Sequence, residues 1–138
     1  MSVLVTKAGA GDQAVASTSP TKVTFDSIGY DLNENFDISN SRFTPRAGRH
    51  AFHACLQVTG ITAEQIVLHI YKDGAAWRQV SRRMGDTGTG AYDTLEIIAH
   101  DRTDGTHYYE VFVDSGSDSS FTVEGDADKT WFEAWELA

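Results

Sequence analysis

The feature that most constrains this chain is a two-residue alternation of apolar and polar side chains, with no long stretch of helical period. Between residues 50 and 58 the even positions are His50, Phe52, Ala54, Leu56 and Val58. Successive side chains of a β-strand point to opposite faces of its sheet, so this pattern predicts a strand with one face in a core. Four further stretches alternate in a similar way: 66–71, 95–99, 108–113 and 131–137.

Clusters of Gly, Asp, Asn and Ser separate these stretches, which is typical of an all-β chain. The length of 138 residues and the hydrophobic fraction of 41% suit one folded domain. Residues 1–21 are rich in Ala, Gly, Ser and Thr and show no sustained period. We therefore expect them to be a flexible or anchoring N-terminal arm, and residues 22–138 to form the domain.

Several strands are apolar on both faces, which leaves large aromatic side chains outside a single core. A monomer seldom exposes that much contiguous aromatic surface. Either loops cover these side chains or other subunits do, and we favour the second interpretation, an obligate oligomer. The candidate interface residues are Tyr71, Tyr108, Phe112, Trp131 and Trp135.

The segment "YDLNENFDISNSRFTPRAGRHAFHACLQV" resembles the signature of C1q/TNF-like jelly-roll domains. The matching positions are Phe36-Asp37, Arg42-Phe43-Thr44, Pro45, Gly48 and Phe52. Two later stretches, "VLHIYKDG" and the "TWFEAWEL" that holds Phe132 and Ala134, are similar to further strands of the family. The resemblance implies an all-β, ten-stranded jelly-roll β-sandwich that assembles as a compact homotrimer.

The chain departs from the family at two places, because His50 stands where a Tyr is common and no collagen-like stem is present. Its compact Arg-Phe-Thr-Pro turn is more similar to bacterial and bacteriophage members than to animal ones. We expect Phe43 and Phe52 to anchor the core on either side of this turn. Arg42, Arg46 and Arg49 would then be exposed and could pair with acidic groups across a subunit boundary.

Composition limits the classes of molecule that this chain is expected to bind. The chain carries 11 Lys and Arg against 20 Asp and Glu, a formal charge of −9, which argues against nucleic acid and anionic membranes as partners. No apolar run is long enough to span a bilayer, and "MSVLV" is too short for the core of a signal peptide. The single cysteine, Cys55, is expected to be a buried thiol.

The sequence contains no recognisable catalytic arrangement, so we expect no enzyme and no cofactor. His50 and His53 lie three positions apart on a strand and therefore point to opposite faces, so they cannot bind one metal ion together. His69 could approach either of them across strands. Acidic loops at 101–104 and 114–128 could bind calcium, but neither follows a calcium-loop spacing, and solvated turns are the interpretation we favour.

A second basic cluster is a candidate ligand site. An indole beside guanidinium groups could bind an anionic glycan by stacking and ion pairing. The alternative is an exposed strand edge protected by charge. The residues concerned are Trp77, Arg78, Arg82 and Arg83.

These features predict a non-enzymatic, trimeric surface module of a bacteriophage-like particle, such as a decoration protein or the knob of a head or tail fibre. It would be made in the host cytoplasm, attach to the virion through residues 1–21, and stabilise the particle or recognise a host-surface glycan or protein. The alternative is a free-standing bacterial lectin-like protein, cytoplasmic or surface-associated. A cupin-like metalloenzyme with His ligands is a third hypothesis.

Overall fold

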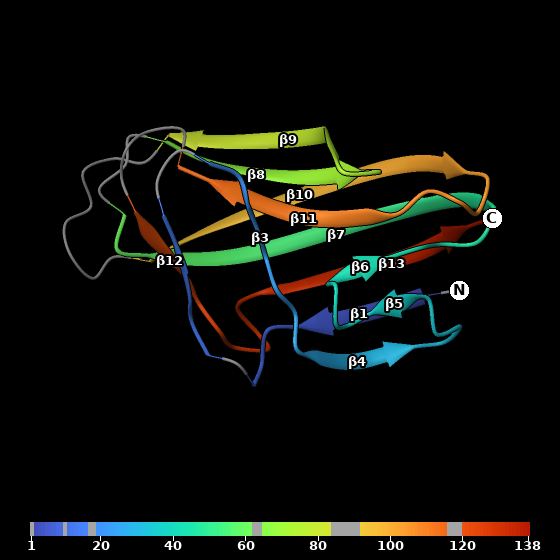
Figure 1. Ribbon diagram of the computed structural model, residues 1–138, viewed down its shortest axis with the longest axis horizontal. Helices are drawn as coiled ribbons and strands as arrows, with labels where there is room; N and C mark the ends of the chain where they lie inside the picture. Colours follow the sequence, from blue (N-terminus) through green and yellow to red (C-terminus); the bar gives the residue numbers. More distant parts are fainter. Residues whose placement is uncertain (1, 10, 17–18, 62–64, 84–91, 116–119) are drawn as a thin grey trace.

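The computed structural model describes residues 2–9, 11–16, 19–61, 65–83, 92–115 and 120–138, apart from the Arg83 side chain. These residues form two antiparallel β-sheets that pack face to face (Figure 1). The seven-stranded sheet contains β1 (Ser2–Thr6), β2 (Gln13–Val15), β4 (Ser27–Asp31), β7 (Gly48–Thr59), β10 (Tyr92–Thr103), β12 (Phe121–Val123) and β13 (Trp131–Leu137). The six-stranded sheet contains β3 (Thr21–Lys22), β5 (Phe36–Asp37), β6 (Arg42–Phe43), β8 (Gln65–Lys72), β9 (Ala75–Arg83) and β11 (Tyr109–Asp114).

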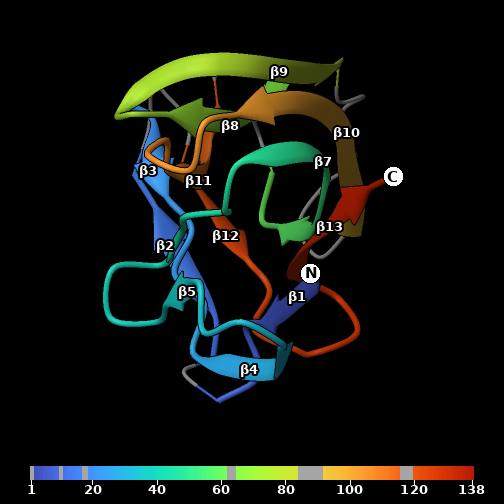
Figure 2. The ribbon, with the colours of Figure 1, turned by 90° about the vertical axis from the view of Figure 1, so that its right-hand side faces the viewer.

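The strand order confirms an all-β sandwich with crossovers between the two sheets. In the seven-stranded sheet the order is β2-β12-β7-β13-β1-β4, with β10 paired to the other side of β7. In the six-stranded sheet it is β5-β6-β11-β8-β9, with β3 paired to β11. Figure 2, turned by 90°, shows β8 and β9 in one layer and β13 and β1 in the other. We expected ten strands; the described residues form thirteen, several of which are only two or three residues long.

One face of the long strand β7 packs in the core, and it is the face that the alternation of apolar residues predicted. Phe52 is fully buried, and its ring centroid lies 4.3 Å from that of Tyr109 in β11 and 6.3 Å from that of Phe43 in β6. Phe132 of β13 packs against both Phe43 and Phe52. The expectation that Phe43 and Phe52 anchor the core is therefore confirmed.

The turn between β5 and β6 is held by the carboxylate of Asp37. This carboxylate accepts hydrogen bonds from the Asn40 and Ser39 side chains and from both backbone N–H groups. These bonds, that of the Asn40 side chain first, lower the pKa of Asp37 to about 2. Beyond this turn, Gly48 opens β7 with a φ of 151°, and a Cβ there would lie 3.2 Å from the Glu136 carboxylate.

The sequence "KDG" forms a tight turn between β8 and β9. Asp73 and Gly74 both have positive φ values, 52° and 79°, which is the pattern of a type I′ hairpin turn. Asp73 tolerates this conformation while its carboxylate accepts hydrogen bonds from the Tyr108 backbone N–H and from His107. This turn is therefore fixed to the start of β11.

The expectation of an N-terminal arm is wrong for residues 2–6. They form β1, which pairs with β13 on one side and with β4 on the other. Val3 and Val5 are fully buried, and the Gln13–Val15 strand β2 pairs with β12. The C-terminal strand that pairs with the short apolar stretch "VLV" is distant in sequence. The sequence alone therefore did not predict that this stretch is a strand of the sheet.

A buried polar cluster joins the two sheets at the end where β10 finishes. The Asp101 carboxylate of β10 accepts hydrogen bonds from Lys72 of β8 and from the Tyr109 hydroxyl of β11, both at 2.7 Å. Burial alone would raise the pKa of Asp101, but the hydrogen bonds from Lys72 and Tyr109 lower it. Burial and the same hydrogen bond raise the pKa of Tyr109 far above its usual range. The phenol therefore donates to a charged acceptor.

Replacing Tyr109 with Phe removes one donor from this cluster and leaves the ring in the core. We expect Tyr109→Phe to lower the free energy of unfolding by about 2 kcal/mol, because the lost hydrogen bond goes to a charged and half-buried carboxylate. Urea unfolding followed by tryptophan fluorescence measures the change. Tyr108→Phe is the matched control, since no hydrogen bond of its hydroxyl is found among the described residues. Equal stabilities of the two variants would contradict the assignment.

Candidate self-association surface

The outer face of the seven-stranded sheet carries rows of side chains that cross three neighbouring strands. β7 lies in the centre, with β13 on one side and β10 on the other. Because partners in an antiparallel ladder share a face, the strand register sets these rows. In the order β13, β7, β10 they are Trp135–Ala51–His100, Glu133–His53–Ile98 and Trp131–Cys55–Glu96.

Two tryptophans flank the small residues of β7. The Trp131 ring meets the His53 ring edge-on with 4.5 Å between centroids, and Trp135 is the ladder partner of Ala51. Ala51 and Cys55 point outward, yet both are buried because larger neighbours surround them. Trp131 and Trp135 are themselves half-buried, so each keeps part of its ring surface at the protein surface.

The apolar surface continues onto β10. Ile98, the ladder partner of His53, is 60% exposed, and Tyr92 at the start of the same strand is 62% exposed. Among the described strands, β10 pairs only with β7, so its other edge has no strand partner, although Arg82 and Asp93 bind the backbone of Thr94 there. Exposed large apolar side chains on an edge strand are typical of a surface that another protein covers.

His53 sits between two carboxylates in the middle of this face. Its Nδ1 lies 3.3 Å from Glu133 Oε1, and its Nε2 lies 3.6 Å from Glu96 Oε2. In contrast, the His50 side chain points into the sandwich, where its Nε2 lies 2.9 Å from the Arg46 carbonyl oxygen. Burial lowers the pKa of His50. The expectation that His50 and His53 point to opposite faces is confirmed.

The opposite outer face, on the six-stranded sheet, is rich in paired charges. The Tyr71 and Phe112 rings stack with 3.9 Å between centroids, and the His69 ring meets Tyr71 edge-on. Beside them His69 Nε2 lies 2.6 Å from Asp114 Oδ2, and both side chains are buried. His69 therefore belongs to a different sheet from His50 and His53 and meets neither.

Glu110 organises the other half of this face. Its carboxylate lies 2.6 Å from Lys22 Nζ and 3.3 Å from Arg42 Nη2. The Arg42 guanidinium also covers the ring of Tyr108 at 3.9 Å from the centroid. Contacts within the chain therefore occupy part of the surface of all three aromatic side chains here: Tyr71, Tyr108 and Phe112.

The five predicted interface residues thus separate into two groups on opposite sides of the molecule. Trp131 and Trp135 share one face with the exposed Ile98, and the other three residues lie on the far face. No single flat contact can use all five. Sequence reasoning missed Ile98, although the alternation of Leu95, Ile97 and Ala99 places its side chain on the opposite face of the strand.

The predicted ligand residues are only partly together. The Trp77 indole packs edge-on against the core rings of Phe52 and Tyr109, and the Arg78 guanidinium lies 4.5 Å from its centroid. Arg82 instead reaches the other sheet, where Nη1 lies 2.9 Å from Asp93 Oδ1 and from the Thr94 carbonyl oxygen. The Arg83 side chain lies outside the described part.

The acidic loops make structural contacts within the chain. The Asp104 carboxylate accepts hydrogen bonds from the Thr106 backbone and side chain, and Glu124 accepts one from Thr59. In the part of the chain that the structure describes, no group of three His, Cys, Asp or Glu side chains is arranged to bind a metal ion. The same part contains no helix long and apolar enough to cross a membrane.

Comparison with known proteins confirms the fold class. No family model and no curated protein matches the sequence. The structure is similar to that of Eiger TNF from S. frugiperda, with a TM-score of 0.79 and 10% identity, over 100% of this chain and 92% of the other. It is also similar to the globular domain of zebrafish complement 1qA protein, with a TM-score of 0.66 and 13% identity, over 99% and 95%. The chain therefore has a C1q/TNF-like jelly-roll fold.

The environment of Cys55 makes its thiol unreactive. Burial, followed by the nearby Glu96 carboxylate 3.8 Å away, raises the pKa of Cys55 to about 11. A thiolate is the reactive form, so we expect iodoacetamide to alkylate the folded protein at pH 8 on the order of a hundredfold more slowly than free cysteine. The rate should rise with pH towards 11 and recover fully in urea. Equal rates in the folded and urea-unfolded protein would contradict this environment.

Proposed function

We propose that this chain is a non-enzymatic module that assembles as a homotrimer through the outer face of its seven-stranded sheet. The observation that supports the proposal is that Trp131, Trp135, Ile98 and Tyr92 share this outer face, with Ile98 and Tyr92 largely exposed on the edge strand β10. Burying such side chains stabilises an interface by about 25 cal/mol per Å² of apolar area. The proposed stoichiometry of three is supported by the resemblance to the C1q/TNF-like family and by a fold of that type.

Charge supports contact through this face rather than through the opposite one. With a net charge of −9, copies of the chain repel one another at long range, so association must come from local apolar contact. On the six-stranded sheet, Lys22 and Arg42, which are partly exposed beside the buried Glu110, would have to be desolvated, which costs free energy unless new partners compensate.

The non-enzymatic part of the proposal is supported by the positions of the histidines. His50 lies inside the sandwich, and His53 and His69 lie on opposite outer faces, each beside carboxylates. A cupin-like site would require such side chains to converge on one ion. Here each histidine contributes to local packing and charge pairing.

We propose that the module is made in the host cytoplasm and is a decoration or fibre protein of a bacteriophage-like particle. There it would stabilise the particle or recognise the host surface. This role follows from the similarity of the Arg-Phe-Thr-Pro turn to phage members of the family. Anchoring through residues 1–21 is not part of the proposal, because Ser2–Thr6 is a core strand. A free-standing lectin-like protein is the alternative; a sugar that stacks on Trp77 would have to displace Arg78.

Ile98→Glu tests the self-association surface. The side chain is already 60% exposed in one chain, so a charge there is tolerated by the fold but is costly in an apolar interface. We expect the wild type to have roughly three times the chain mass of 15.1 kDa in light scattering, and the variant to be a folded monomer.

Ile38→Glu is the matched control, since Ile38 is an exposed isoleucine in the β5–β6 turn of the other sheet. It should remain trimeric. A wild type that is monomeric at micromolar concentration, or an Ile98→Glu variant that remains trimeric, would reject this surface.

The particle role has its own test. If the chain is a virion component, an antibody against it should label intact purified particles of the phage whose genes surround its own. A gene neighbourhood without capsid or tail genes, together with binding of the trimer to a defined sugar on a glycan array, would favour the lectin-like alternative.

A further inference from the structure

Two arginines lie side by side at one end of the seven-stranded sheet. Arg49 of β7 and Arg102 of β10 are direct ladder partners, and both side chains are exposed. Like charges directly opposite each other in an antiparallel pair are destabilising. The chain has almost twice as many acidic as basic residues, yet at this position it places two arginines side by side.

These two arginines differ from the other basic residues. Among the described side chains, neither guanidinium has a hydrogen bond or an ion pair. Every other described Lys and Arg side chain contacts an oxygen: Lys7 contacts Thr24; Lys22 and Arg42 contact Glu110; Arg46 contacts Glu136; Lys72 contacts Asp101; Arg78 contacts the Trp77 carbonyl; Arg82 contacts Asp93; and Lys129 contacts Glu124.

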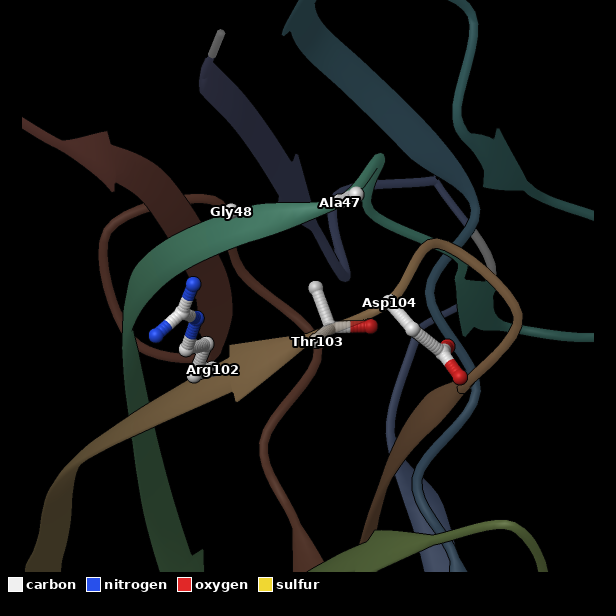
Figure 3. Close-up of a pocket in the computed structure, with 5 residues that line it drawn as sticks. All are labelled: Ala47, Gly48, Arg102, Thr103 and Asp104. Carbon is white, nitrogen blue, oxygen red and sulfur yellow. The ribbon is translucent and has the colours of Figure 1, made fainter.

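The nearest carboxylates of the chain are directed elsewhere. Asp101 binds Lys72 and Tyr109 between the sheets, and Glu136 pairs with Arg46. Figure 3 shows the Arg102 guanidinium directed towards β7 near Gly48, while the Asp104 carboxylate points away from it. The chain therefore leaves the charge of this pair uncompensated on the outer face.

The pair borders a concave surface. Arg49 and Arg102 line a hollow of about 360 Å³ together with His100, Asp101 and Leu137. Arg102 also lines an adjoining hollow of about 610 Å³ with Ala47, Gly48, Thr103 and Asp104 (Figure 3). Hollows of this size are large enough for a small ligand.

We propose that Arg49 and Arg102 form a binding site for the oxyanion of a small ligand, either a carboxylate or a phosphate group. Each guanidinium presents parallel N–H donors that match two oxygens of such a group. His100 can donate a further hydrogen bond, and Leu137 offers an apolar contact for the rest of the ligand. All of these side chains come from one chain, and their row lies next to the Trp135–Ala51–His100 row of the proposed trimer surface.

Calorimetric titration of the full chain at low salt tests the site, with sodium phosphate and sodium glucuronate as the two probes. We expect one anion per chain, and the stronger probe identifies the kind of oxyanion. Arg49→Gln and Arg102→Gln should each weaken binding at least about tenfold, because each removes hydrogen bonds to a charged group. Arg102→Lys keeps the charge but loses the paired donors, so it should also weaken binding.

Lys129→Gln is the matched control, since it removes the same charge from a partly exposed side chain at the other end of β13. It should bind like the wild type. Equal binding by Lys129→Gln and Arg102→Gln would show a general charge effect and overturn the proposal. Failure of both probes to bind folded wild-type protein would also overturn it.

Thermal melting gives a second measurement. Arg49→Glu replaces a repulsive pair by an attractive one, so its melting temperature should exceed that of the wild type without phosphate and should not rise when phosphate is added. A wild type whose melting temperature does not respond to either anion would contradict the site. Light scattering on the same samples separates this result from the state of association.

Discussion

Hydrogen bonding of β7 on both of its sides is the constraint on which the rest of the structure depends. Once Gly48–Thr59 pairs with β10 and β13, the alternation of its side chains assigns every residue to one of two sides. Phe52 enters the core, where it meets rings from β6, β11 and β13. His53 is placed on the outer face between Glu133 and Glu96. One strand therefore fixes both the packing and the exposed surface.

Charge distinguishes the two outer faces. On the six-stranded sheet, the buried carboxylates of Glu110 and Asp114 lie beside Lys22, Arg42 and His69, so both have partners within the chain. On the seven-stranded sheet the exposed side chains include Ile98, while Arg49 and Arg102 have no acidic partner among the described residues. Covering exposed apolar area with another molecule is favourable, whereas desolvating ion pairs costs free energy. The second face therefore fits the proposed self-association better than the first.

Local sequence patterns predicted part of the core. The alternation along β7 and the Phe-Asp and Arg-Phe-Thr steps led to Phe43 and Phe52 as core anchors, because both signals depend on neighbours in sequence. The role of Ser2–Thr6 could not be predicted, since its partner β13 is at the other end of the chain. The Arg49–Arg102 pair was hidden for the same reason: a shift of one residue in the β7–β10 register would place the two arginines on opposite faces.

The position of β1 in the sheet determines how a deletion of residues 1–21 has to be interpreted. If residues 1–21 were a separate arm, their deletion would distinguish a virion anchor from a free lectin-like protein. In this fold the deletion would remove Val3 and Val5 from the core, expose an edge of β13 and leave β4 without a partner. Loss of function after such a deletion would then report unfolding. Attachment to a particle has to be sought in surface substitutions, which leave the sheet intact.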